Sequence, residues 1–481
     1  MLTEPSVQLF GVDGETGGYA LPPLSPADLA RVARGEGTVP VPPRIDPVAG
    51  PEATAAFNGL VISRPDGGID GPRRGRGDPS QARWNLAENG WGVVWSADDP
   101  RKEKIRRKLA PLLDLRRRQA TRGSRCLFHD LEHRKDESFW QFQDRYGAER
   151  EEFNPRNLPR FLLLIGGPEA IPFDFQVQLA RSYAVGRIDF AALDDFAHYA
   201  KAVVDAERSR KKHDRRVAVF APEHPDDPLS QKSAEQLGGG LEKALRSAAG
   251  WKVEARIGRE ATKRRLTDLL AGPAPALLFT AGHGALFRSG DERQPDVQGA
   301  LVCADWAGPK GGHMTAETYL AAADVPDRAD LSSSIAFHFA CCSLGVPAKN
   351  LLHQSVPAIP PDLAPRPMLA RLPERLLAQG ALAVIGHIDL AFATTFGNGK
   401  EPTLFTGCCR SLLEGLPVGA AVEGFRTRCV DRALELNDLR SSELGGTEVP
   451  PERISAVWMA YHDASHYAVL GDPAVRLPAA R

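Results

Sequence analysis

Short runs of consecutive apolar residues alternate with helical stretches over most of this chain. Residues 161–165, 217–220 and 276–280 are almost wholly apolar, and turn residues or charged residues bound each run. Runs of this length without polar alternation predict strands that are buried on both faces of a sheet. Residues 233–247 and 262–270 show helical patterns between the later runs. Strands that alternate with helices indicate right-handed crossovers, so we expect an α/β fold with a mainly parallel sheet and helices on both faces.

The pattern changes twice along the chain, which divides it into three parts. Residues 1–85 are rich in proline and glycine and have only brief apolar runs, so we expect an arm or an irregular lobe. Residues 86–212 predict a smaller α/β subdomain around the strand at 161–165. Residues 213–481 predict the larger α/β domain, with further strands at 334–340 and 381–387.

Composition and charge are those of an ordinary globular protein. Of the 481 residues, 42% are hydrophobic and 25% are charged, and the formal net charge is -1. The whole molecule therefore has no electrostatic reason to bind nucleic acid or anionic lipid. The first residues lack the pattern of a signal peptide, and no apolar run approaches the ~18 residues that a membrane span needs. We expect a cytoplasmic protein without a membrane partner.

One stretch departs from this balance. Residues 100–125 contain eleven Lys or Arg residues, against Glu103 and Asp114. No aromatic residues interleave these charges, as they do in many surfaces that bind single-stranded nucleic acid. The pattern therefore favours a solvated helix face over a nucleic-acid contact.

Cysteine is used sparingly, and its spacing is unusual. The seven cysteines are odd in number and include two adjacent pairs, unlike the disulfide framework of a secreted protein, so we expect reduced thiols. Structural zinc draws on spacings such as C-x(2-4)-C, which adjacent cysteines do not provide. We expect no metal and no cofactor. The cysteines are Cys126, Cys303, Cys341, Cys342, Cys408, Cys409 and Cys429.

Two predicted strands end in residues that can carry out chemistry. Sites in α/β sheets lie beyond the carboxyl ends of strands. His283 follows the strand at 276–280, between Gly282 and Gly284, and histidine titrates close to neutral pH, which suits a general base. Cys341 and Cys342 follow the next strand, and a thiol needs a nearby base to become a nucleophile. Each signal alone fits an ordinary turn histidine or buried cysteine, but together they predict a His–Cys dyad.

The segments around this dyad resemble a known family. Residues 280–284, Thr-Ala-Gly-His-Gly, are similar to the histidine motif of metacaspases and gingipains, and residues 339–341, Phe-Ala-Cys, resemble the strand end of caspase-like peptidases. Residues 160–172 and 185–188 are similar to the amino-terminal half of the gingipain catalytic module. Residues 469–473, Val-Leu-Gly-Asp-Pro, resemble its carboxyl-terminal close. The resemblance covers roughly residues 90 to 477 and implies a caspase-like fold of gingipain-type layout.

Either adjacent cysteine can be aligned with the nucleophile of that family. The Ala-Cys pattern selects Cys341, whereas the Cys-x-x-Gly spacing of metacaspases and gingipains selects Cys342, with glycine at Gly345. We favour Cys341, because a small residue before the nucleophile at the strand end recurs more widely in the fold. Ala340 stands where metacaspases carry an aspartate that recognises basic side chains, so Arg/Lys specificity does not carry over.

The resemblance implies a cysteine-type endopeptidase that acts on a protein or peptide, and it leaves room for an activating partner protein. The Gly284 N–H is the oxyanion donor that the resemblance implies, and no third catalytic residue is indicated. Two other functions stay open. One is a catalytically weak caspase-fold binding or signalling module, and the other is a thiol hydrolase or acyltransferase on a non-peptide substrate. Candidate pocket residues are His387, Asp389, Asp305 and Trp306.

Overall fold

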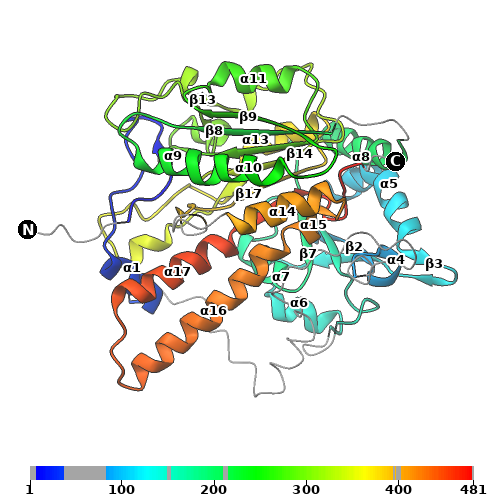
Figure 1. The fold of residues 1–481 in the computed structure, drawn as a ribbon. Helices are drawn as coiled ribbons and strands as arrows, with labels where there is room; N and C mark the ends of the chain where they lie inside the picture. Colours follow the sequence, from blue (N-terminus) through cyan, green and yellow to red (C-terminus); the bar gives the residue numbers. More distant parts are fainter. Residues whose placement is uncertain are drawn as a thin grey trace, which may run out of the picture.

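A ten-stranded sheet runs through the computed structural model, which describes residues 7–36, 83–148, 153–209, 215–393, 396 and 402–478 (Figure 1). The strands are, in order across the sheet, β5 (Phe128–His133), β2 (Trp91–Ser96), β6 (Phe161–Ile165), β7 (Ala184–Ile188), β18 (Tyr467–Gly471), β17 (Ala383–His387), β14 (Ile335–Phe339), β10 (Leu277–Ala281), β8 (Arg216–Pro222) and β9 (Lys252–Gly258).

The sheet has two halves whose strands point in opposite directions. Neighbouring strands are parallel throughout, except that β17 and β18 are antiparallel. Every residue of β6, β10, β14 and β17 is buried, so both faces of the sheet are covered at these strands. The predicted α/β class with a mainly parallel sheet is confirmed.

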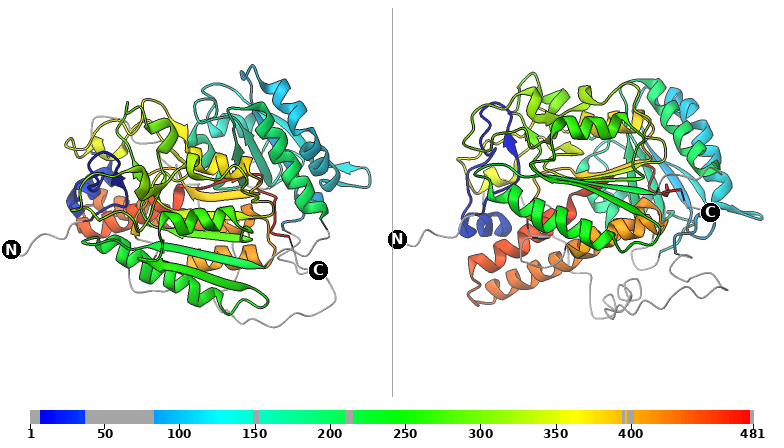
Figure 2. Two further views of the ribbon diagram at one scale, coloured as in Figure 1. Left: turned by 90° about the horizontal axis from the view of Figure 1, so that it is seen from above. Right: turned by 45° about the horizontal axis from the view of Figure 1, so that its top comes forward.

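Helices cover the sheet on both faces, and α16 and α17 lie side by side (Figures 1 and 2). The helices are α1 (Pro26–Arg34), α4 (Leu86–Asn89), α5 (Lys102–Gln119), α6 (Phe139–Arg145), α7 (Phe173–Ala180), α8 (Leu193–Arg208), α9 (Pro228–Lys232), the π-helix η1 (Ser233–Gly239), α10 (Gly240–Leu245), α11 (Lys263–Ala271), α12 (Gln294–Val297), α13 (Arg371–Ala378), α14 (Thr403–Leu413), α15 (Val418–Ala421), α16 (Glu423–Leu444) and α17 (Pro451–Ser465). No helix in the described ranges is long and apolar enough to cross a membrane.

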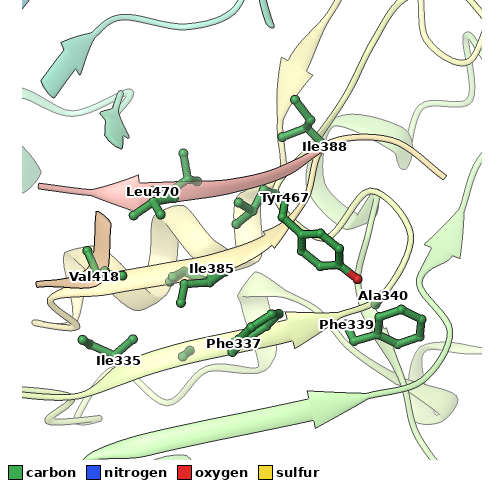
Figure 3. Close-up of a cluster of buried hydrophobic side chains, with 14 of the residues drawn as sticks. Ile335, Phe337, Phe339, Ala340, Ile385, Ile388, Val418, Tyr467 and Leu470 are labelled. Atoms are coloured by element: carbon green, nitrogen blue, oxygen red, sulfur yellow. The ribbon is translucent and has the colours of Figure 1, made fainter. Parts of the chain in front are cut away.

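The hydrophobic core is continuous across the middle of the sheet. Figure 3 shows Phe337 of β14, Ile385 of β17 and Leu470 of β18 on neighbouring strands. The ring of Tyr467 packs 5.9 Å from that of Phe337, and both side chains are buried. Burial of these apolar side chains stabilises the fold at about 25 cal/mol per Å² of surface removed from water.

A buried ion pair joins α5 to the turn after β18. Asp472 is fully buried, and its carboxylate accepts hydrogen bonds from Arg116 Nε at 2.6 Å and from the Trp91 indole N–H at 3.0 Å. Arg116 is also almost fully buried, although the surrounding charged positions of α5 are largely exposed. The prediction of a solvated basic helix therefore needs one exception at Arg116, because this side chain meets Asp472 and Glu207.

The amino-terminal segment is more ordered than the predicted arm. Residues 7–36 contain β1 (Val12–Asp13) and α1, whose first turn is closed by a capping box between Ser25 and Asp28. In Figures 1 and 2 this segment, in blue, lies beside the half of the sheet that contains β10 and β14 and away from the cyan strands. Residues 1–6 and 37–82 of the predicted arm, and the predicted boundary near residue 212, lie outside the described residues.

Candidate functional site

The two strand ends singled out in the sequence meet at one edge of the sheet. β10 and β14 are parallel neighbours, and Ala281 is the register partner of Phe339. His283 follows β10 by two positions, and Cys341 follows β14 by two positions. Parallel pairing therefore brings the predicted base and the predicted nucleophile to the same edge.

Gly284 lies directly against the backbone of the predicted nucleophile. A Cβ atom built on Gly284 would lie 2.1 Å from the Cys341 carbonyl oxygen, closer than any side-chain carbon can approach. Only glycine fits at this position. The backbone of Gly284, the predicted oxyanion donor, therefore lies next to the backbone of Cys341.

His283 makes one hydrogen bond at each ring nitrogen. Nε2 lies 2.7 Å from the Asp227 Oδ2 atom, so Nε2–H donates to this carboxylate. Nδ1 accepts a hydrogen bond from the Gly11 N–H at 3.0 Å. The carboxylate thereby fixes the tautomer of His283 in which the proton is on Nε2, and the Nδ1 lone pair is directed toward the Gly11 N–H.

Asp227 was not recognised in the sequence, where no third catalytic residue was indicated. It lies in the turn between β8 and α9, at the carboxyl end of the strand next to β10. Burial raises the pKa of this carboxyl, but the electrostatic interaction with His283, the His224 imidazole 3.6 Å away and the hydrogen bonds from His283 and Tyr19 lower it by more, and the pKa falls well below its usual range. Asp227 is therefore ionised, and its carboxylate accepts the hydrogen bond from His283 Nε2–H. The signal in the sequence was an acidic residue just after a neighbouring buried strand.

The thiol of Cys341 is buried and hydrogen-bonded. Its Sγ donates to the Phe10 carbonyl oxygen at 2.6 Å and accepts from the Ala391 N–H at 3.1 Å. Burial raises the pKa of Cys341 well above its usual range, so the thiol is protonated in this arrangement.

Cys342 lies in a different environment. Its backbone is in the left-handed region, with φ of 54°, and its N–H donates to the Asp389 carbonyl oxygen at 2.8 Å. Burial also raises the pKa of the Cys342 thiol. This thiol interacts with Gln298, whereas the Cys341 thiol contacts the Phe10 carbonyl oxygen. The geometry therefore favours Cys341 over Cys342 as the partner of His283.

The amino-terminal segment covers His283 and Cys341, which the sequence did not predict. The peptide group between Phe10 and Gly11 presents its oxygen to Cys341 and its N–H to His283. β1 then continues as a parallel partner of β11 (Ala285–Leu286), which begins two residues after His283. Phe10, His283 and Cys341 are each at most 1% exposed, so this segment closes the site to solvent.

The four predicted pocket residues do not form one pocket. The Trp306 ring packs edge-on against His283 with centroids 5.7 Å apart, so Trp306 does belong to the site. Asp305 instead accepts the Lys263 N–H at the start of α11. His387 is fully buried, with Nδ1 2.8 Å from the Asp389 carbonyl oxygen and Nε2 3.1 Å from the Asp463 carbonyl oxygen; a neutral imidazole donates to one of the two, which is the structural role expected of a buried histidine.

Two clusters in the described part of the chain have side chains that suit a metal ion, although the sequence predicted none. In the first, His224, Asp227 and His283 offer ligand atoms within 4.8 Å of one another. The second cluster contains the predicted pocket residue Asp389 with His462 and His466, and these ligand atoms also lie within 4.8 Å of one another. Imidazole and carboxylate are common zinc ligands.

Comparisons with known proteins yield likenesses to solved structures alone. No protein-family model and no curated protein matches the sequence. The chain is similar to a structure described as a protease, at 14% identity over 80% of this chain and 78% of that chain, with a TM-score of 0.46. It is similar to the Arg-specific cysteine proteinase gingipain R, at 13% identity over 81% of this chain and 78% of that chain, with a TM-score of 0.45.

A third similar structure is the separase–securin complex of Saccharomyces cerevisiae. The identity is 11%, the match covers 66% of this chain and 15% of that chain, and the TM-score is 0.31. Gingipains are also the proteins that the sequence motifs resemble. At these identities and scores, the chemistry of the site has to be judged from its own geometry.

Proposed function

We propose that this chain is a cysteine-type endopeptidase, with Cys341 as nucleophile, His283 as general base and acid, and Asp227 as the residue that orients His283. One observation carries this proposal. A single peptide unit, Phe10–Gly11, has its carbonyl oxygen at the Cys341 thiol and its N–H at the His283 Nδ1 atom. These two contacts arrange nucleophile and base on the two sides of one peptide bond.

The proposed reaction begins with transfer of the Cys341 proton to His283 Nδ1. The thiolate attacks the carbonyl carbon of the substrate, and backbone N–H groups of Gly284 and Cys341 stabilise the oxyanion. The carbon–nitrogen bond then breaks, and His283 gives its proton to the leaving amine. Water, activated by the same imidazole, hydrolyses the thioester and restores the thiol. Asp227 remains ionised and stabilises the imidazolium in both halves of the reaction.

The test compares Cys341→Ala, Cys342→Ala and His283→Ala with the parent chain. Because residues 7–14 cover the site, each variant is made both in the natural sequence and with Phe10→Ala. Labelling by acyloxymethyl ketone probes and cleavage of a mixed-sequence peptide library are measured. We expect Cys341→Ala and His283→Ala to abolish both readouts and Cys342→Ala to retain them. Activity that survives Cys341→Ala but not Cys342→Ala would contradict the nucleophile assignment.

Two other functions give different results in this test. A binding or signalling module shows neither labelling nor cleavage in any of these proteins. A thiol hydrolase or acyltransferase is labelled through the same dyad but leaves peptides uncut, and mass spectrometry of its products identifies the group transferred. The contact between the dyad and a peptide bond favours the endopeptidase.

A further inference from the structure

We propose that Phe10 occupies the specificity pocket of this site, which therefore selects an aromatic or bulky apolar residue on the amino-terminal side of the cleaved bond. The inference rests on the proposed peptidase function and names the substrate class of the same dyad. It follows from the position of Phe10, whose carbonyl group is the one at the Cys341 thiol. Phe10 therefore stands where the residue before the cleaved bond of a substrate has to lie.

Aromatic rings surround the Phe10 side chain. Its ring lies edge-on to Phe339 with centroids 5.1 Å apart, 5.0 Å from His283 and 6.3 Å from Phe396. Phe339 is the last residue of β14, and the nucleophile follows it by two positions. Edge-to-face and tilted contacts at these separations are favourable for aromatic pairs. The pocket is thus built by the same strand that presents Cys341.

The charges at the site do not suit a basic residue in this pocket. Asp227 is occupied by His283 and by the hydroxyl of Tyr19, which donates to Oδ1 at 2.7 Å. Asp389 accepts the Leu390 N–H through Oδ1, and its Oδ2 faces His462 at 3.5 Å. A lysine or arginine in place of Phe10 would lose its hydration among the aromatic rings, and neither Asp227 nor Asp389 would form an ion pair with it.

The backbone after Phe10 also lies as a substrate strand would. The Val12 N–H donates to the Gly284 oxygen at 3.1 Å, and the Gly14 N–H donates to the Leu286 oxygen at 2.7 Å. Addition of a strand to an exposed edge is a common mode of peptide recognition, in which main-chain bonds give affinity and side-chain pockets give specificity. Here the added strand fixes the register that places Phe10 in the pocket.

The segment is held in a form that resists its own cleavage. The Phe10 oxygen accepts the Cys341 hydrogen, and the Gly11 N–H occupies the Nδ1 lone pair that would have to remove this hydrogen. Gly11 also has a φ of 123°, which an ordinary substrate residue rarely adopts. Residues 7–14 thus occupy the substrate site of their own chain, and a substrate has to displace them before it can bind.

The test uses four peptidyl acyloxymethyl ketone probes that differ only in the residue next to the ketone, which is Phe, Ala, Arg or Asp. Labelling rates at Cys341 are measured by mass spectrometry on the full chain and on Phe10→Ala. The Phe probe should label at least about tenfold faster than the Arg and Asp probes. Phe10→Ala should raise the rate of the Phe probe by about tenfold or more, since the anchor of the occupant is lost.

Two controls separate occupancy from general loosening. Leu29→Ala truncates a fully buried side chain in α1, outside the contacts with the dyad, and should leave the rates within about threefold. Phe10→Leu keeps an apolar side chain and should give a rate between those of the parent and Phe10→Ala. If thermal unfolding shows that Phe10→Ala does not fold, Phe10→Leu replaces it in the comparison with the parent.

Failure of this inference differs from failure of the peptidase proposal. An Arg or Asp probe that labels as fast as the Phe probe overturns the pocket assignment, while Cys341 labelling still supports a peptidase. Equal rates in the parent, Phe10→Leu and Phe10→Ala overturn the role of Phe10 as occupant. Alkylation of Cys341 by iodoacetamide in Phe10→Ala, without labelling by any peptidyl probe and without peptide cleavage, overturns the peptidase function itself.

Discussion

At the scale of single residues, the reactivity of each thiol depends on its surroundings. Cys341 and Cys126 are both free cysteines, but Cys341 is fully buried and Cys126 is exposed on β4 (Arg125–Cys126). Burial raises the pKa of Cys341, whereas a hydrogen bond with Thr121 lowers the pKa of Cys126. The proposed nucleophile is therefore the less reactive of the two while residues 7–14 cover it.

We predict that a small alkylating reagent distinguishes these two thiols. At neutral pH iodoacetamide should modify Cys126 within minutes and leave Cys341 of the parent chain largely unmodified, because Cys341 is protonated and inaccessible. Peptide mapping by mass spectrometry gives both rates in one sample, and Cys126 acts as the internal control. Rapid modification of Cys341 in the parent chain would show that the segment does not hold its place over the site.

We predict that Asp227→Asn lowers the turnover rate by about a hundredfold or more, because an amide can neither fix the required His283 tautomer nor stabilise its positive charge. Peptide cleavage in the Phe10→Ala background measures the loss, and circular dichroism checks the fold. Tyr19→Phe is the matched control: it removes the tyrosine hydrogen bond to Asp227 and keeps the carboxylate, so its effect should stay below about tenfold. Equal losses for the two variants would contradict an orienting role for Asp227.

At the scale of elements, α5 is attached to the centre of the sheet by one charged side chain. Arg116 projects from its last turn to Asp472, which follows β18, and both side chains are at most 1% exposed. A buried pair of this kind adds little stability over an apolar pair of the same shape, but loss of one partner leaves a charge without compensation.

We predict that Arg116→Met lowers the free energy of unfolding by about 3 kcal/mol or more, because Asp472 stays buried without its cation. Lys104→Met changes an exposed residue of the same helix and should alter the free energy of unfolding by less than about 0.5 kcal/mol. Urea denaturation followed by tryptophan fluorescence measures both. A cost for Arg116→Met as small as that of Lys104→Met would mean that water enters and solvates Asp472.

The sequence alone was sufficient to predict the strands that consist of local apolar runs. β6, β8, β10 and β14 were predicted within one or two residues, because the first three are built on continuous apolar runs bounded by turn or charged residues, and β14 is apolar except for His338. Parallel pairing then placed the ends of β10 and β14 together, and with them His283 and Cys341. These two positions required no information beyond local pattern and the rules of α/β sheets.

Other parts of the site depend on contacts that local pattern does not record. Asp227 lies in a turn with Asp226 and proline neighbours, where an acidic residue is ordinary, and only its pairing with His283 distinguishes it. The contact of Gly11 with His283 joins residues 272 positions apart. The proline- and glycine-rich composition of residues 1–85 indicated an irregular lobe, and nothing in it showed that residues 10 and 11 reach the dyad.

At the scale of the whole molecule, several histidines are buried without charge. Burial lowers the pKa of His338 to about 3 and that of His387 to about 4. His338 has one partner, the Thr280 hydroxyl, while its Nε2 atom is buried without a hydrogen bond. The unfolded chain binds a proton at such a histidine below about pH 6.5, whereas the folded chain does so only near the lowered pKa. For His338, lowering the pH from about 6.5 to about 3 therefore favours unfolding.

We predict that the stability of the protein falls as the pH is lowered from 6.5, and that His338 accounts for about 2 kcal/mol of the loss by about pH 4.5. His338→Phe should flatten the dependence of unfolding free energy on pH, whatever it does to stability at pH 7. His198→Gln changes a histidine whose side chain is 64% exposed on α8 and should leave the dependence unchanged. Parallel curves for the parent and His338→Phe would mean that the folded protein protonates His338 without cost.

The position of β18 in the sheet has a consequence for how the protein is made. β18 lies between β7 and β17 and joins the two halves, yet a ribosome translates it after all nine other strands of the sheet. Until then β7 and β17 are open edges, each with a row of unpaired amide and carbonyl groups that invites pairing with other chains. Nascent chains that stall before residue 467 should therefore need protection by chaperones, whereas a completed chain closes this gap with its own last strand.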